Sequence, residues 1–229
     1  LLIYMTFFFI DFGFLDFKLL NKTLIFSLFS FGFWLSLQTL VQQFFVSFDN
    51  VIITNLLGIE QLPYYSTVYD LSSRLLIIPT SISAGLVPAI SYWLKENSIT
   101  QIKVLVEKLY RKIFILIIPS SIILIFFSKI FLKLWVSEEF SNNSYIAFII
   151  IIIAFNFITY SFLNFKIIIG YGRPDYFFYM TFFSVLIFSF LTYVLIQDYG
   201  INGVAFSVLV KGIIDCFSSK IYLTKILKF

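Results

Sequence analysis

The amino-acid sequence predicts an all-α integral membrane protein that folds as a six-helix transmembrane bundle. Its 229 residues are 60% hydrophobic and 12% charged, with a mean hydropathy of +0.99, whereas soluble domains are about 45–50% apolar and about 25% charged. The apolar residues form continuous stretches, and a helix needs about 20 such residues to cross the hydrocarbon layer. Strands of a transmembrane barrel would instead alternate apolar and polar residues, so bundled helices remain.

The composition also excludes several classes of chemistry. The chain has no His and one cysteine, Cys216, so it can form neither an internal disulfide nor a His or Cys metal site. We therefore expect no cofactor and no bound metal. The net charge of +4 comes from basic residues in short segments between apolar stretches, as membrane insertion favours. This pattern indicates a lipid bilayer as partner rather than a nucleic acid.

The spans follow from the apolar stretches and the turn signals between them. Residues 1–22 contain an apolar run too short to cross the membrane and a polar connection. We expect them to be the tail of a preceding helix, whose beginning is missing, and a cytoplasmic connection. The six spans are expected within 23–229, at Thr23–Phe48, Tyr64–Trp93, Ile113–Trp135, Tyr145–Ile169, Tyr176–Ile196 and Ile201–Leu223.

Helix breakers and polar segments mark the joints between these spans. Pro79 and Pro88 interrupt the second span and Pro119 the third, and a proline bends a membrane helix because it frees backbone carbonyls. The segment Lys95–Lys112 is rich in basic residues, so we expect a cytoplasmic amphipathic connection there. The turn sequence GYGRPDY ends the fourth span, and QDYGING separates the fifth from the sixth.

The loop charges predict the orientation. If the first span starts in the cytoplasm, every loop obeys the positive-inside rule, and the reverse orientation violates it. The cytoplasmic set includes Lys22, the basic residues of 95–112, Arg173 and Lys220. Acidic residues such as Glu138 and Asp198 then lie outside. We expect a multi-pass membrane protein with a cytoplasmic C-terminus; the resemblance described below implies the inner membrane of a bacterium as its location.

Two pairs of charged residues remain within the spans, where an ionisable side chain costs several kcal/mol unless it is paired, solvated or turned to the interior. Asp70 and Arg74 share one helical face by i,i+4 spacing, and Lys211 and Asp215 repeat the pattern. Each pair could neutralise itself and hold helices together. Alternatively, Arg74 and Lys211 line one water-filled cavity and bind an anionic group such as a pyrophosphate, a task that suits the planar donors of arginine.

Polar uncharged residues within the spans are weaker candidates. Gln38 and Gln42 share a face of the first span, and Asn156 and Asn164 lie in the fourth. Such amides commonly hydrogen-bond between helices, although Gln42 could also bind a sugar. We therefore place Arg74, Lys211, Asp70, Asp215 and Gln42 as candidate substrate-binding residues and expect no catalytic residue.

Three blocks of sequence together resemble the O-antigen and polysaccharide transporter branch of the multidrug, oligosaccharidyl-lipid and polysaccharide exporter superfamily. The first, FDNVIITNLLGIEQLPYYSTVYDLSSRLLIIPTSISAGLVPAIS, covers 48–91. It resembles the family's helix-ending aspartate, leucine-glycine turn and Tyr-Ser helix with its Ile-Pro and Val-Pro-x-x-Ser motifs. IIIGYGRPDY and QDYGINGVAFSVLVKGI resemble two later turns in order and spacing. The resemblance covers the chain from about residue 11, but only the C-terminal lobe of the family's fold.

The resemblance implies one lobe of a two-lobe exporter, which works by alternating access. It also implies a flippase that moves an undecaprenyl-pyrophosphate-linked oligosaccharide from the cytoplasmic to the periplasmic leaflet for surface polysaccharide synthesis. Arg74 and Lys211 would line its cationic cavity. The other wall would come from the missing N-terminal lobe or from a second copy of this chain.

Two other functions are compatible with a polytopic, aromatic-rich chain. An O-antigen polymerase or membrane glycosyltransferase would need a catalytic constellation, and the sequence has no paired carboxylates, His base or nucleophile in a suitable arrangement. A multidrug or cation extruder of the same superfamily would favour an acidic cavity over Arg74 and Lys211. The charge of the cavity thus distinguishes these alternatives.

Overall fold

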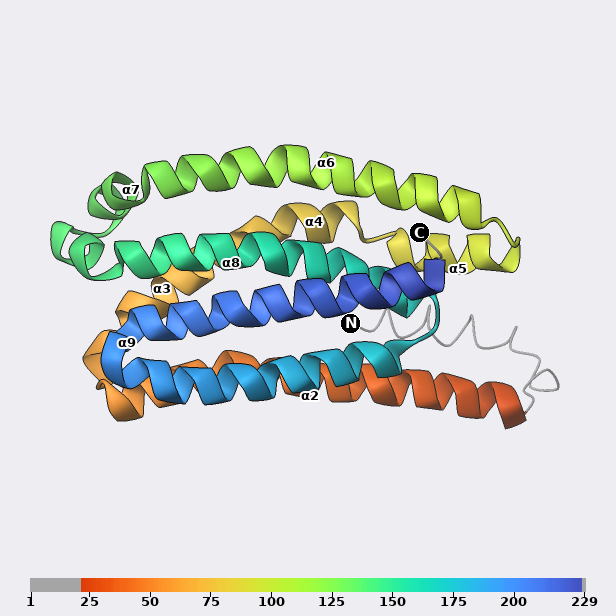
Figure 1. Cartoon of the computed structure of the whole chain (residues 1–229), viewed down its shortest axis with the longest axis horizontal. Coiled ribbons are helices and arrows are strands. Elements are labelled where there is room, and N and C mark those ends of the chain that lie inside the picture. The colour runs from red at the N-terminus through yellow and green to blue at the C-terminus, as the bar shows by residue number, and fades with distance from the viewer. Residues whose placement is uncertain (1–21, 228–229) are drawn as a thin grey trace, which may run out of the picture.

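The computed structural model describes residues 22–227, which are helical almost throughout (Figure 1). The helix tail and connection expected over 1–22 therefore lie outside the described residues, except for Lys22. The helices are α2 (Lys22–Leu56), α3 (Leu62–Ser73), α4 (Ile77–Ile82), α5 (Leu86–Lys95), α6 (Ile99–Phe126), α7 (Ser128–Trp135), α8 (Glu138–Gly170) and α9 (Pro174–Leu227), with 3₁₀ turns η3 (Ile59–Gln61) and η4 (Arg74–Leu76).

Within the described residues, five helical stretches are long and apolar enough to cross a membrane. They are α2, the run Ile59–Lys95 built from α3 to α5, α6, α8 and α9. The last is not one straight rod, because Gly200 has non-helical dihedral angles (φ 56°, ψ −137°) and separates two helical arms. Figure 1 shows these arms lying side by side. With α9 divided at Gly200, the five candidate spans comprise six helical segments, the number that the sequence predicts.

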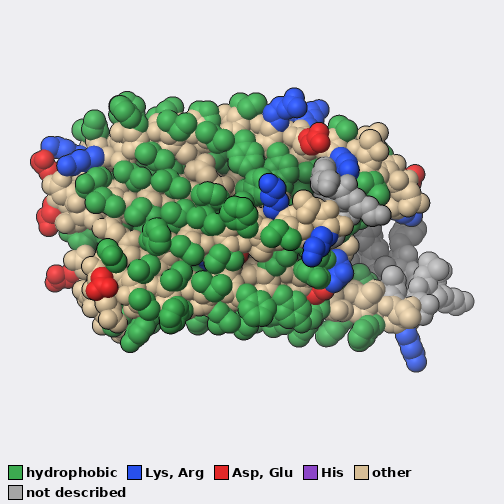
Figure 2. All heavy atoms as spheres, in the orientation of Figure 1, with side chains coloured by type: hydrophobic (Ala, Val, Ile, Leu, Met, Phe, Trp, Pro, Cys, Tyr) green, Lys and Arg blue, Asp and Glu red, His purple; other side chains and the backbone are tan. Residues whose placement is uncertain are grey.

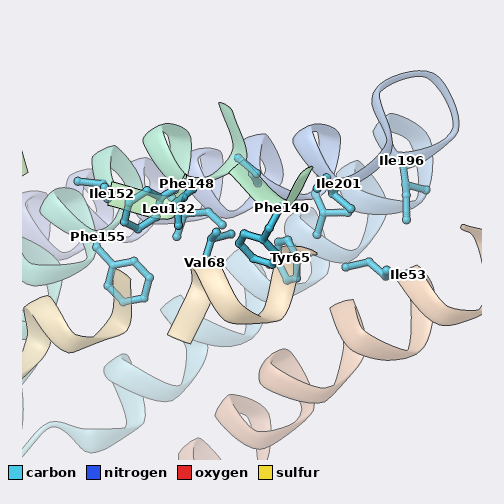
Figure 3. Packing of buried hydrophobic residues seen from close by; sticks show 14 of the residues in the cluster. Ile53, Tyr65, Val68, Leu132, Phe140, Phe148, Ile152, Phe155, Ile196 and Ile201 are labelled. Carbon is cyan, nitrogen blue, oxygen red and sulfur yellow. The ribbon is translucent and has the colours of Figure 1, made fainter. Parts of the chain in front are cut away.

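The turns between segments gather at two ends of the bundle, each with its own buried core. One end, named here the Gly200 end, packs Ile53, Tyr65, Phe140 and Ile201 together (Figure 3). The other, the Gly172 end, packs residues such as Ile90, Ile102, Ile168 and Tyr222. Figure 2 shows a broad hydrophobic band on the visible face between these charged ends, as a bundle that spans a bilayer requires.

The second span is more broken than the prediction of one bent helix from 64 to 93. The chain tightens into the 3₁₀ turn η4 about one helical turn before Pro79, and it leaves the helix at Ser83–Gly85 about one turn before Pro88. Both breaks follow from proline chemistry, because the ring lacks an N–H and clashes with the carbonyl four residues earlier. The span is therefore a chain of three short helices.

The prediction for the third span was wrong at both ends. The basic segment 95–112 is not a separate connection, because α6 runs without interruption from Ile99 through Pro119 to Phe126. The residues after Phe127 form a separate eight-residue helix, α7, which Figure 1 shows at the Gly200 end of α6. The apolar pattern continues through both helices, so hydropathy alone merged them into one span.

Close packing of the two α9 arms depends on glycine at two positions. Gly200 adopts a positive φ with an extended ψ, which side-chain-bearing residues rarely tolerate. A Cβ on Gly203 would lie 2.3 Å from the carbonyl oxygen of Leu195. Glycine at 203 therefore lets the second arm start directly against the end of the first.

We expect Gly203→Ala to destabilise the protein by about 1–3 kcal/mol, because the added methyl group clashes with a backbone atom. The midpoint of thermal unfolding in detergent would measure the effect. Gly32→Ala is the matched control, since a Cβ there meets no atom within 4 Å and alanine is the better helix former. Equal midpoints for both variants would contradict the close packing of the arms.

Candidate functional site

The second span turns a mainly polar and small-residue stripe outward. Asp70, Arg74, Ser81 and Ala84 are exposed at the spacing of one helical face, with the exposed Ile77 between Arg74 and Ser81. The outward face of α6 differs, because Ile115, Ile118, Ile122 and Phe126 make it apolar, as lipid contact requires. The stripe of the second span thus carries charged and hydroxyl groups where the stripe of α6 carries only apolar side chains.

Asp70 and Arg74 lie in the first half of the run Ile59–Lys95, the half nearer the Gly200 end, and line the same hollow of about 330 Å³, together with Thr67, Leu71 and Trp135. The predicted shared face is therefore confirmed. The two side chains form no ion pair within 4 Å among the described residues. The α-helix ends at Ser73 and Arg74 begins a 3₁₀ turn, in which residues four apart no longer stack.

Helix α2 carries a second outward polar stripe, which the sequence analysis missed. Ser36, Thr39, Gln43 and Ser47 are all exposed and lie on one flank of the helix. The spacing of these residues is visible in the sequence, so helical periodicity could have identified them. The sequence analysis singled out Gln38 and Gln42 instead, because their side chains are large, polar and on one helical face.

The polar flank of α2 lies on the side of α3, and the apolar flank lies on the side of α9. Asp49 faces α3, since its carboxylate accepts a hydrogen bond from the hydroxyl of Tyr65 at 2.7 Å. The ring of Phe44 lies 5.4 Å from that of Phe48, which in turn contacts Phe188 of α9. With 3.6 residues per turn, Gln43 then projects on the α3 side. Because α2 and α3 are in contact, the two exposed polar stripes lie on neighbouring helices, and they are together named here the polar face.

Lys211 and Asp215 form the ion pair that their spacing predicts. The Nζ atom of Lys211 lies 2.6 Å from Oδ2 of Asp215, and the two residues are 4% and 3% exposed. The ring of Phe45 in α2 lies 4.6 Å below the ammonium group and adds a cation–π contact. Lys211 does not line the hollow beside Arg74, so the described structure does not bring the two cations of the expected cavity together. Packing of the second α9 arm against α2 buries the lysine.

The uncharged polar residues singled out within the spans differ in whether they form hydrogen bonds. Asn156 exchanges hydrogen bonds with Ser121 of α6, and Asn164 accepts one from Tyr110 while donating one to Ser219. These amides therefore link helices, as expected. Gln42 is half-buried, and the amide of the buried Gln38 has no hydrogen-bond partner within the described structure.

These features define a polytopic helical membrane protein whose bundle has one polar, charge-bearing face. A family model described as a polysaccharide biosynthesis protein matches residues 3–145, and the chain belongs to this family. A curated relative from Shigella flexneri, named "Putative O-antigen transporter", is 26% identical over 188 residues, which cover 82% of this chain and 44% of the relative. The chain thus spans less than half of that relative's length. No solved structure matches the chain.

The polar face predicts a difference in water access between neighbouring residues of α2. In a protein whose Cys216 is replaced by serine, Gln43→Cys should react with a membrane-impermeant maleimide, because the polar flank faces water. Phe44→Cys should not react, because the apolar flank faces lipid. Ser81→Cys and Ile118→Cys provide the same comparison on the second and third spans. Equal labelling of Gln43→Cys and Phe44→Cys would contradict the polar face.

The free energy of unfolding should depend strongly on the presence of both Lys211 and Asp215. Lys211→Met should destabilise the protein by about 3–5 kcal/mol, because it leaves the Asp215 carboxylate buried without its partner. The double change Lys211→Met with Asp215→Leu should restore most of that stability. Thermal unfolding of both variants tests this expectation. A stable double variant that has lost transport would instead assign the pair to the substrate.

Proposed function

We propose that this chain is one lobe of a transporter that flips undecaprenyl-pyrophosphate-linked oligosaccharide repeat units from the cytoplasmic to the periplasmic leaflet. The chain's family and the name of its Shigella flexneri relative support a role in polysaccharide synthesis and transport. The observation that carries the proposal is that Asp70 and Arg74 are exposed within the second candidate span. Charged groups within a span need water or protein around them, so we assign their face to the wall of a hydrophilic passage.

In this proposal the passage is completed by a second lobe, which is a further part of the same protein or another copy of the chain. The lobe corresponds to residues 23–229 and the segment 1–22 connects it to the preceding helix. Without a second lobe, the stripes of α2 and α3 would lie against lipid tails, which cannot hydrogen-bond to them. The proposed setting is the inner membrane of a bacterium, with the C-terminus in the cytoplasm.

The proposed mechanism divides the substrate between two environments. The sugar head group moves along the polar face while the polyprenyl tail stays in the lipid. Alternating access then requires one lobe to rock against the other. The breaks at η4 and at Ser83–Gly85 supply points at which the second span can bend, and interrupted helices of this kind commonly line transporter sites. This chain performs no covalent chemistry in such a cycle.

Arg74→Ala in the intact protein should abolish transport while the protein remains folded and in the membrane. The single-repeat lipid-linked oligosaccharide should then accumulate in the cytoplasmic leaflet, and surface polysaccharide should disappear. Arg111→Gln is the matched control, since Arg111 is an exposed cation of α6 away from the polar face. Leaflet-specific chemical labelling of the oligosaccharide measures the outcome.

The same measurement distinguishes the alternatives. Accumulation in the periplasmic leaflet on deletion of the gene would indicate that polymerisation is the missing step. Unchanged lipid-linked intermediates and unchanged surface polysaccharide would refute the proposal and favour the export of small molecules. Normal polymer output from Arg74→Ala would contradict the role of the polar face.

A further inference from the structure

The hollow beside Arg74 is lined by both polar and aromatic side chains. Its walls are Thr67, Asp70 and Leu71 of α3, Arg74 of η4 and Trp135 of α7, and its volume is about 330 Å³. It therefore combines a hydroxyl, a carboxylate, a guanidinium group and an indole within one pocket. Specific small-molecule sites combine apolar or aromatic walls with a few polar groups in this manner.

Trp135 is held in place as part of this pocket rather than as a membrane anchor. Its ring stacks on Phe131 at 5.7 Å, and Phe131 stacks on Phe148, which is 1% exposed. This ladder ties the indole to the buried core of the Gly200 end, while 55% of Trp135 remains exposed. The neighbouring Leu134 is 82% exposed and does not line the hollow, so it serves the contact with surrounding lipid.

The charges in the hollow point to a neutral polar ligand. Asp70 and Arg74 do not form an ion pair with each other, so the carboxylate can accept and the guanidinium can donate hydrogen bonds to a ligand. A phosphate or pyrophosphate would gain the attraction of Arg74 but suffer the repulsion of Asp70. A neutral sugar ring avoids this repulsion. Its hydroxyls can donate hydrogen bonds to Asp70 and accept them from Arg74.

We propose that this hollow binds one sugar ring of the lipid-linked saccharide, with its apolar C–H face stacked on the indole of Trp135. Asp70 accepts hydrogen bonds from ring hydroxyls, Arg74 donates to ring oxygens, and Thr67 contributes its hydroxyl. This assignment rests on the proposed function and makes Trp135 a residue that recognises the saccharide rather than the pyrophosphate. The hollow lies towards the Gly200 end, where Trp135 ends α7 and two residues separate it from the start of α8.

The test compares two probes on the intact protein in lipid nanodiscs. One probe is the lipid-linked repeat unit extracted from the producing strain, and the other is undecaprenyl pyrophosphate without sugar. Trp135→Ala should weaken binding of the sugar-bearing lipid by about tenfold and leave binding of undecaprenyl pyrophosphate unchanged. Trp135→Phe should retain most of the affinity, because phenylalanine keeps an aromatic face. Leu134→Ala is the matched control and should change neither affinity.

The outcomes separate this proposal from the proposed function. If Trp135→Ala leaves binding of the sugar-bearing lipid unchanged, or weakens both probes equally, the sugar site is refuted. If the unmodified protein binds neither lipid, the proposed function itself fails. Asp70→Asn provides a second variant in case Trp135→Ala does not fold, and it should also weaken the sugar-bearing lipid alone.

Discussion

The hydrocarbon layer offers no hydrogen-bond partner and no solvation to a charge, and this constraint governs every polar residue in the bundle. The chain meets it in three ways. Lys211 and Asp215 neutralise each other in the interior. The buried Asp49 receives a hydrogen bond from Tyr65. Asp70 and Arg74 remain outside the bundle and unpaired with each other, which is tolerable only where water or protein covers them. The first two arrangements stabilise the fold, and the third is the basis of the proposed function.

Identical sequence spacing led to opposite structures in the two charged pairs. Both pairs are acid and base at i,i+4, so the sequence alone could not separate a structural pair from an exposed one. The difference lies in the neighbouring helices. Phe45 of α2 covers Lys211, whereas the proline-induced turn at Arg74 breaks the register with Asp70. Tertiary packing and a local break decided the outcome, and neither is encoded in the spacing.

Other features were accessible from the sequence in different degrees. The long apolar stretches predicted the membrane-crossing segments, because span length is set by the bilayer. The boundary between α6 and α7 was not accessible, since the break at Phe127 has no proline or glycine to mark it. The polar flank of α2 could have been predicted from the sequence, because Ser36, Thr39 and Gln43 recur at helical spacing. The position of Trp135 beside α3 required the structure, because it depends on how α7 packs at the end of the bundle.

The tight turn at Gly200 also bears on how the protein enters the membrane. Its two arms are joined without an intervening loop and start in contact through Gly203. Neither arm can therefore reverse its direction independently of the other. If the last two segments enter the membrane as one helical hairpin, both of its free ends lie on the same side of the bilayer. Arg173 and Lys220, near those two ends, then add to the same positive-inside signal.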